Sequence, residues 1–302
     1  ERDLPLDAAA LSLAMCDHDA LCVTVTDAIN AALISTAGAR VKLIANFGVG
    51  FNHIDVAAAK QAGITVTNTP DVLTDATADL AILLLLMATR RAGEGERELR
   101  EGRWTGWRPT HLMGQSVAGK TLGIVGFGRI AQATAHRAHH GFGMRIAYHG
   151  RRRAPADVEA ACGASYVANL DALIASSDVL SLHAPLTPQT RHVVNARTLG
   201  LMKPHAIIVN TSRGPLIDHG ALHQALQNNQ IGGAGLDVFE PEPPNLADLL
   251  YADERVIATP HIAFVSEESL VNLRERTARQ VVDALSGRVP ENVINPQALQ
   301  SR

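Results

Sequence analysis

The stretch "TLGIVGFGRIAQATAHRAHHGFGMRIAYHGRRR", residues 121–153, decides the fold of this chain. An apolar run ends at Gly126, a helix-compatible run follows, and a second apolar run starts at Met144. In the G-x-G-x-x-A pattern, Gly126 permits a tight turn, Gly128 lets a pyrophosphate approach the backbone, and the small Ala131 keeps the helix close to the sheet. An ordinary strand-to-helix turn is the alternative. The strand–turn–helix context favours a dinucleotide site, with the phosphates at the helix N-terminus.

The second apolar run leads into three consecutive arginines. A unit that binds NAD normally offers an acidic side chain to the ribose about 20 residues after the glycines. Here Arg151, Arg152 and Arg153 occupy that place, and the next acid is Asp157. Guanidinium groups bind a phosphate through charge-assisted hydrogen bonds. We therefore expect NADP as the cofactor, with NADPH preferred and NAD possible. Arg151 is the first choice for the contact and Arg152 the second, while Arg153 faces water. A solvated basic loop is the alternative interpretation.

Composition excludes several classes of protein. The chain has 302 residues, 46% of them hydrophobic, and a formal net charge of −3, which gives no electrostatic footprint for nucleic acid or an anionic membrane. The longest apolar run, residues 80–88, is much shorter than the roughly 20 residues that span a bilayer. Three scattered cysteines indicate a reducing, cytoplasmic location. No metal is expected, because the histidines at 136, 139 and 140 have no accompanying Glu or Cys cluster.

The order of apolar runs predicts an α/β chain. Short β-rich runs at 21–25, 41–45 and 64–67 precede a helix from a cap at Asp75 to about Arg91, and a turn-rich connector covers 101–120. From Thr121 onward, strands are expected at 121–126, 144–148, 179–182, 206–210, 233–237 and 256–258, and the last helix at about 266–286. Strands that alternate with helices in this way indicate a parallel sheet flanked by helices.

Several further motifs occur in a fixed order along the chain. They are "GVGFNHID" (48–55), the glycine turn, "HAPLT" (183–187), "NTSRG" (210–214), "LDVFEPEP" (236–243) and "TPH" (259–261). Together they resemble the D-2-hydroxyacid dehydrogenase family over essentially the whole chain. The segments "NTPDVLTDATADLA" (68–81) and "GWRPTHLMG" (106–114) are most similar to its glyoxylate/hydroxypyruvate reductase branch, which commonly uses NADPH. This agrees with the arginine argument.

The resemblance implies two domains, a Rossmann doubly wound parallel sheet and a flavodoxin-like substrate domain. Residues 1–81 would form the first part of the substrate domain, 82–267 the NAD(P)-binding domain, and 268–302 the returning segment of the substrate domain. The active site would lie in the cleft between the domains, and their closure would exclude water from the hydride. Chains of this family normally begin with a further strand–helix–strand, so the substrate domain is expected to be shortened or incompletely represented here.

The resemblance also assigns catalytic roles. His261 would donate the proton to the substrate carbonyl, and Glu242 would be the carboxylate that keeps the imidazole charged. Arg213 would grip the substrate carboxylate and polarise the carbonyl. Backbone N–H groups around Val49 and Gly50 would also bind that carboxylate. Trp107 would reach across a homodimer interface and narrow the pocket of the neighbouring subunit.

The expected cofactor-binding residues follow from the glycine turn, the arginines and the resemblance, in which Asp237 takes the nicotinamide carboxamide. They are Gly126, Gly128, Arg129, Ile130, His149, Gly150, Arg151, Arg152, His183, Ala184, Pro185, Thr190, Thr211, Ser212, Arg213, Asp237, His261 and Ala263. The expected reaction is NADPH-dependent reduction of glyoxylate to glycolate and of hydroxypyruvate to D-glycerate. Two alternatives stay open. They are an NAD-dependent dehydrogenase of another 2-hydroxy acid and a non-catalytic, dinucleotide-sensing corepressor of the same fold.

Overall fold

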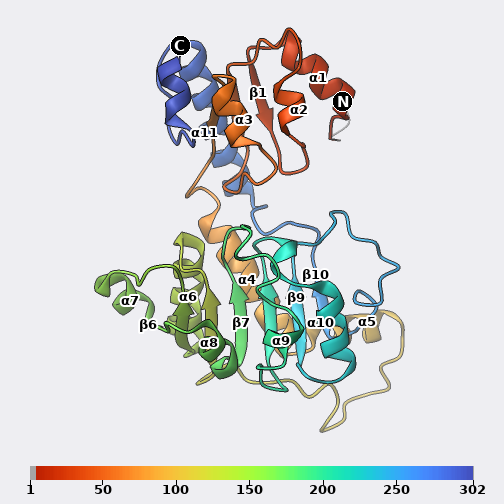
Figure 1. The fold of residues 1–302 in the computed structure, drawn as a ribbon. Coiled ribbons are helices and arrows are strands. Elements are labelled where there is room, and N and C mark those ends of the chain that lie inside the picture. Colours follow the sequence, from red (N-terminus) through yellow and green to blue (C-terminus); the bar gives the residue numbers. More distant parts are fainter. Residues whose placement is uncertain (1–4, 302) are drawn as a thin grey trace. The chain divides into compact units, whose positions relative to one another are not determined.

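The computed structural model of the protein describes residues 5–301 and divides the chain into two compact units (Figure 1). Unit 1 consists of residues 1–73 and 265–302, and unit 2 of residues 74–264. The sequence placed the boundaries after residues 81 and 267 instead. The earlier first boundary arises because the helix that starts at Thr74 packs on α6 (Arg129–Phe142), β8 (Ile207–Asn210) and β9 (Gly233–Leu236) of unit 2. Among the described residues, no helix is long and apolar enough to cross a membrane.

Unit 1 is built on a small parallel sheet in the order β1-β2-β3. Its strands are β1 (Ala20–Val23), β2 (Leu43–Asn46) and β3 (Thr65–Thr67), and its helices are α1 (Ala8–Asp17), α2 (Ala31–Ile34), α3 (Val56–Gln61), α11 (Glu267–Leu285) and the 3₁₀ helix η2 (Pro296–Ser301). Side-chain caps start several of these helices: Asp7, Asn30, Asp55 and Ser266 each accept a first-turn N–H. The returning helix α11 packs on β2, so the two ends of the chain belong to one unit.

Unit 2 contains a seven-stranded, entirely parallel sheet in the order β10-β9-β8-β7-β4-β5-β6. Its strands are β4 (Thr121–Val125), β5 (Arg145–His149), β6 (Ala164–Tyr166), β7 (Val179–Leu182), β8 (Ile207–Asn210), β9 (Gly233–Leu236) and β10 (Val256–Ala258). Its helices are α4 (Thr74–Thr89), α5 (Ala92–Arg100), α6 (Arg129–Phe142), α7 (Ala156–Cys162), α8 (Leu170–Ser176), α9 (Ala196–Leu199), α10 (His219–Gln227) and the 3₁₀ helix η1 (Gly214–Leu216).

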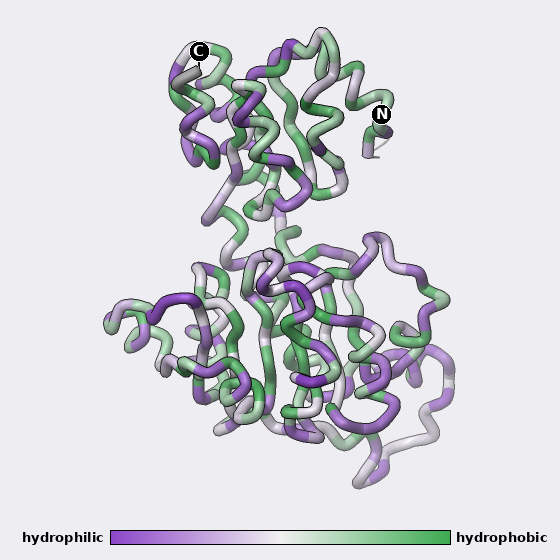
Figure 2. Tube along the Cα trace, viewed as in Figure 1, coloured by the Kyte–Doolittle hydropathy of each residue, from purple (hydrophilic) through white to green (hydrophobic). Residues whose placement is uncertain are grey.

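Helices cover both faces of the large sheet, and its central strands β7 and β8 are buried along their whole length (Figure 2). Alternate residues of one strand enter different cores. In β8, Ile207 and Val209 belong to the core beneath α4 and α6, and Ile208 belongs to the core beneath α8, α9 and α10. This arrangement confirms the expected α/β class with a doubly wound Rossmann sheet.

Two local predictions were wrong. Strand β6 was missed because it has only three residues, lies at the sheet edge and has no apolar run of its own. Asp75 was expected to cap the helix, but it lies within the first turn of α4, and its carboxylate accepts a hydrogen bond from Arg137 of α6 at 2.8 Å. A second bond from Arg137 to Asp79, at 2.6 Å, ties α6 to the start of α4.

Candidate active site

Apart from Trp107, the predicted site residues of unit 2 lie at or after the carboxyl ends of its strands. The sheet is parallel, so all these ends lie at one edge. The chain order reverses between the neighbouring strands β4 and β7, since β5 and β6 continue on one side and β8 to β10 on the other. Ligands of open α/β sheets bind outside the carboxyl ends at such a switch point. The glycine turn and the 183–185 segment lie directly there.

The glycine turn after β4 has the geometry of a phosphate cradle. Gly126 has a φ of +85°, and a Cβ on it would lie 2.9 Å from the backbone of Ala184. Gly128 precedes the first residue of α6, and a Cβ on it would meet nothing within 4 Å. The open space in front of a 14-residue helix therefore fits an anion, which the N–H groups and the helix dipole favour. Arg129 and Ile130 form the exposed and half-buried start of this helix.

A hydrogen bond joins the loops after β7 and β8, because the Ser212 hydroxyl donates to the Ala184 carbonyl at 2.8 Å. Within the loop after β7, the Thr190 hydroxyl donates to the Pro185 carbonyl at 2.7 Å. Beside them, the buried Thr211 Oγ1 has no hydrogen-bond partner among the described residues. A buried hydroxyl without a partner is costly, so this atom fits a site that a polar ligand completes. The residues present therefore suit a dinucleotide.

His183 lies in the same loop but cannot serve as the acid. Burial lowers the pKa of His183 to about 4, and its Nε2 lies 2.8 Å from the Ser181 hydroxyl. The ring is therefore neutral near neutral pH and can only exchange hydrogen bonds.

The turn that carries Arg213 depends on Asn210, which the sequence analysis did not single out. Asn210 is fully buried at the end of β8, where its Nδ2 donates to the Arg213 carbonyl at 2.9 Å and its Oδ1 accepts from the Ser212 N–H at 3.0 Å. Gly214 then lies so close to the Phe239 backbone that a Cβ would fall 2.0 Å from its carbonyl oxygen. The sequence indicates this role of Asn210 only through the general tendency of asparagine to form hydrogen bonds with the backbone of the turn that contains it.

Glu242 and His261 form a direct pair. The Nδ1 of His261 lies 2.7 Å from the Glu242 Oε2, and the other carboxylate oxygen of Glu242 accepts from the Phe239 N–H at 2.8 Å. Burial by itself raises the pKa of Glu242, but the bonds from His261 and Phe239, with the charge of Arg213, outweigh burial and lower it. Glu242 is therefore ionised, and it leaves Nε2 as the ring nitrogen that can face a substrate.

Asp237 holds the loop that carries His261. Its Oδ1 accepts from the Thr259 hydroxyl at 2.6 Å and from the Ile262 N–H at 2.9 Å, and its Oδ2 accepts from the Ala263 N–H at 2.8 Å. Burial raises the pKa of Asp237, and these three bonds oppose the rise. The side chain is fully buried. The structure thus gives Asp237 a loop-fixing role, beside the carboxamide contact that the sequence analysis expects.

The three arginines after β5 differ in their surroundings. Arg153 forms a bidentate pair with Glu159 of α7, with Nη2 to Oε2 at 2.8 Å and Nε to Oε1 at 3.0 Å. The prediction that Arg153 simply faces water was therefore incomplete. Arg151 and Arg152 are exposed, and neither forms an ion pair within residues 5–301. His149 precedes them, and its Nδ1 donates to the Val167 carbonyl at 3.0 Å.

The predicted substrate loop belongs to unit 1. Asn46 Nδ2 donates to the carbonyls of Gly48 and Gly50 at 2.9 and 3.1 Å, and Asn68 Nδ2 donates to the Val49 carbonyl at 2.9 Å. With these carbonyls bound, the N–H groups of Val49 and Gly50 have no acceptor in the described part of the chain. Two consecutive free N–H groups are suited to bind a carboxylate. Neither asparagine was singled out from the sequence. The bond from Asn68 joins residues 19 positions apart, and the bonds from Asn46 are local.

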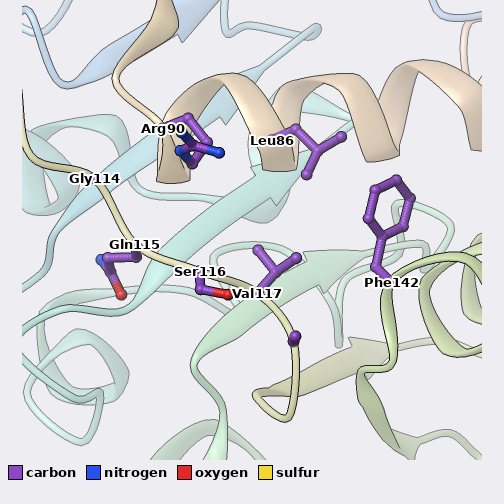
Figure 3. A pocket seen from close by; sticks show the side chains of 8 residues that line it. Leu86, Arg90, Gly114, Gln115, Ser116, Val117 and Phe142 are labelled. Carbon is purple, nitrogen blue, oxygen red and sulfur yellow. The ribbon is translucent and has the colours of Figure 1, made fainter.

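A cavity of about 460 Å³ elsewhere in unit 2 is not this site (Figure 3). It lies between the end of α4, the segment 114–118 and Phe142. Segment 114–118 leads into the amino end of β4, so the cavity opens at the opposite edge of the parallel sheet from the loops described above. Trp107, in the preceding connector, is 81% exposed. No group of three or more His, Cys, Asp and Glu residues that could hold a metal is found among the described residues.

Comparison with known proteins agrees with this geometry. The family described as D-isomer specific 2-hydroxyacid dehydrogenase, NAD binding domain, matches residues 82–263. A glyoxylate reductase of Thermococcus litoralis is 45% identical over 287 residues, which cover 94% of this chain and 85% of that protein. A solved structure from Thermus thermophilus is similar with a TM-score of 0.90 and 41% identity, over 97% of this chain and 91% of that one.

A solved glyoxylate reductase from Paecilomyes thermophila is also similar, with a TM-score of 0.85 and 35% identity over 96% of this chain and 88% of that one. These relatives favour the enzyme over the non-catalytic alternative. The chain therefore belongs to the D-isomer specific 2-hydroxyacid dehydrogenase family and is an oxidoreductase that uses a nicotinamide dinucleotide.

Proposed function

We propose that the protein reduces glyoxylate to glycolate and hydroxypyruvate to D-glycerate with NADPH. The observation that carries this proposal is the His261–Glu242 pair, 2.7 Å apart, in the same unit as the phosphate cradle and Arg213. The similarity to glyoxylate reductases supports the choice of substrates. The choice of NADPH rests on Arg151 and Arg152, which lie where an NAD-binding unit carries an acid.

In this mechanism His261 is the acid. When bound, the reduced nicotinamide supplies the hydride that C2 of the keto acid accepts. The Nε2–H of His261 donates a proton to the carbonyl oxygen, so the C=O double bond becomes a C–O single bond with a new C–H bond and a new O–H bond. Glu242 holds Nδ1 and attracts the positive charge of the protonated ring. The hydride and the proton together convert the 2-keto acid into the 2-hydroxy acid, which then leaves.

Arg213 would bind and polarise the substrate. Burial lowers the pKa of Arg213, and the nearby Glu242 charge opposes the decrease, but a guanidinium remains charged at neutral pH. A cation that is partly shielded from water interacts strongly with a carboxylate. The N–H groups of Val49 and Gly50 would bind the same carboxylate, as the family resemblance implies.

A homodimer is part of the proposal. The connector between α5 and β4 exposes Trp104, Trp107 and Met113, and α4 exposes Leu83. Large apolar side chains that remain exposed can mark protein interaction surfaces. We assign this surface to a second copy of the chain, in which Trp107 would narrow the neighbouring pocket.

Initial rates with each substrate and each cofactor test the proposal. Glyoxylate and hydroxypyruvate should both be reduced, with a higher kcat/KM for NADPH than for NADH. In the double variant R151A/R152A, the KM for NADPH should rise much more than the KM for NADH. An equal rise for both cofactors would contradict the phosphate assignment, and no turnover with either acid would contradict the substrates.

A further inference from the structure

The segment that carries the arginines is fastened at both ends. At its start, the Gly126 N–H donates to the His149 carbonyl at 2.8 Å, and the Tyr166 hydroxyl donates to the Gly150 carbonyl at 3.3 Å. At its end, the Ala154 N–H donates to the Tyr148 hydroxyl at 2.7 Å. A short segment held at both ends has few conformations left, so its exposed side chains start from a fixed backbone.

Tyr148 connects this segment to the glycine turn. The side chain is fully buried, and its ring stacks on Phe127 of the turn, with centroids 3.9 Å apart and planes at 18°. Its hydroxyl also donates to Glu159 Oε1 at 2.6 Å. The buried Tyr148 side chain therefore contacts the phosphate cradle, the arginine segment and α7 at the same time.

Glu159 neutralises only one of the three arginines. The hydrogen bonds from Arg153, followed by that from Tyr148, lower the pKa of Glu159, so its carboxylate is ionised. Arg153 takes up this charge through a fork of two guanidinium nitrogens, a geometry that fixes the direction of the side chain. The charges of Arg151 and Arg152, which are exposed, are left for another anion.

We propose that Tyr148, Glu159 and Arg153 form a latch that positions Arg151 and Arg152 for the additional phosphate of NADP. In this assignment Arg153 is a positioning residue and not a phosphate ligand. The inference rests on the proposed NADPH preference and adds the residues that set it. Preorganisation raises affinity because less conformational entropy is lost when the phosphate binds.

Two variants loosen the latch without a change in net charge. Tyr148→Phe keeps the ring on Phe127 but removes the hydroxyl, and Arg153→Lys keeps the cation but removes the fork. Fluorescence titration with NADPH and NADH should show an NADPH Kd raised about fivefold in each variant, with the NADH Kd within about twofold of the wild type. Arg197→Lys is the matched control, because Arg197 forms a similar fork with Asp171. It should leave both Kd values unchanged.

Circular dichroism and the Tm show whether the variants fold. If Tyr148→Phe does not fold, Arg153→Lys can still overturn the latch, because an unchanged ratio of the two Kd values in that variant would contradict it. A purely structural role would lower the Tm and leave the ratio of the two Kd values at the wild-type value, which would overturn the latch. A loss of the ratio in Arg153→Lys with a wild-type ratio in a folded Tyr148→Phe would make Arg153 a direct ligand and would also overturn it.

The double variant R151A/R152A distinguishes a failure of the latch from a failure of the proposed phosphate contact. If it loses the NADPH preference and the latch variants keep it, the latch fails and the proposed phosphate contact stands. If R151A/R152A weakens both cofactors equally, the proposed NADPH recognition itself fails, and the latch fails with it.

Discussion

At the scale of single residues, the chemistry depends on which nitrogen of His261 is free. Glu242 occupies Nδ1, and the Phe239 N–H fixes the other oxygen of that carboxylate. His261 itself has a φ of +53°, a backbone conformation that residues other than glycine rarely adopt. The bonds of Asp237 to the residues on both sides of His261 hold the loop in this conformation. The hydrogen bond to Glu242 and the loop conformation together fix the direction of the imidazole ring.

His261→Ala should lower kcat for glyoxylate reduction by about 10²–10⁴, because the general acid is lost. Steady-state kinetics with NADPH measures this. Circular dichroism serves as the control and should show that the variant folds like the wild type. An unchanged kcat would contradict the assignment of His261 as the proton donor.

Glu242→Gln should alter the pH dependence of the same reaction. The lowered pKa of Glu242 keeps the carboxylate charged throughout the neutral range, where it favours a protonated neighbour. In the wild type, kcat/KM should fall at low pH, where Glu242 takes up a proton and no longer stabilises the acid. The variant has no group that titrates at this position, so its profile should lack this acid limb. A profile with the same acid limb in both proteins would show that Glu242 acts only as a structural partner.

At the scale of elements, opposite ends of the parallel strands serve different purposes. The carboxyl ends carry the site loops, and a buried carboxylate joins strands at the amino ends. Asp178 precedes β7 and accepts from the Thr121 N–H at 2.8 Å, from Lys203 Nζ at 2.7 Å and from His205 Nε2 at 2.9 Å. It thus ties the start of β4 to the segment before β8.

Asp178→Asn should reduce the free energy of unfolding by about 1–3 kcal/mol near neutral pH. Burial by itself raises the pKa of Asp178, but its hydrogen bonds outweigh burial and hold the pKa well below its usual range. A pKa depressed on folding contributes stability above the unfolded value of about 3.9, and this stability is lost as the pH falls below it. Denaturant unfolding of both proteins should therefore give a smaller difference at pH 3 than at pH 7. A difference independent of pH would contradict this account.

At the scale of the whole molecule, the chain forms two units with separate cores, and the connections between them follow residues 73 and 264. Unit 2 holds the phosphate cradle, Arg213 and the acid pair, and unit 1 holds the loop with the free N–H groups of Val49 and Gly50. The exposed apolar side chains of the 101–120 connector belong to neither core.

The proposed dimer gives a prediction at this scale. Light scattering after size exclusion should give twice the chain mass of 32.1 kDa. Leu83→Glu should shift the mass toward the monomer, since it introduces a charge into an apolar surface. Trp107→Ala should alter the KM for hydroxypyruvate. A mass of one chain at tens of micromolar protein would contradict the dimer.

The sequence alone determined the Rossmann class and the elements that carry the site. The glycine turn, the following arginines and the motifs after β8, β9 and β10 are local patterns, and local patterns report strands, turns and helix starts. The parallel sheet then places all the carboxyl ends at one edge, so the neighbourhood of Arg213, Glu242 and His261 followed from the order of elements.

Only the tertiary structure decided how each side chain is held. Arg137 reaches Asp75 and Asp79, Asn68 reaches Val49, and Asp237 reaches the loop beyond β10, all across long stretches of chain. Even Arg153 and Glu159, only six residues apart, meet because the buried Tyr148 brings the segment and α7 together. No periodicity and no local composition in the sequence indicates such bonds. They arise from packing, which fixes the distance between groups that the sequence leaves unrelated.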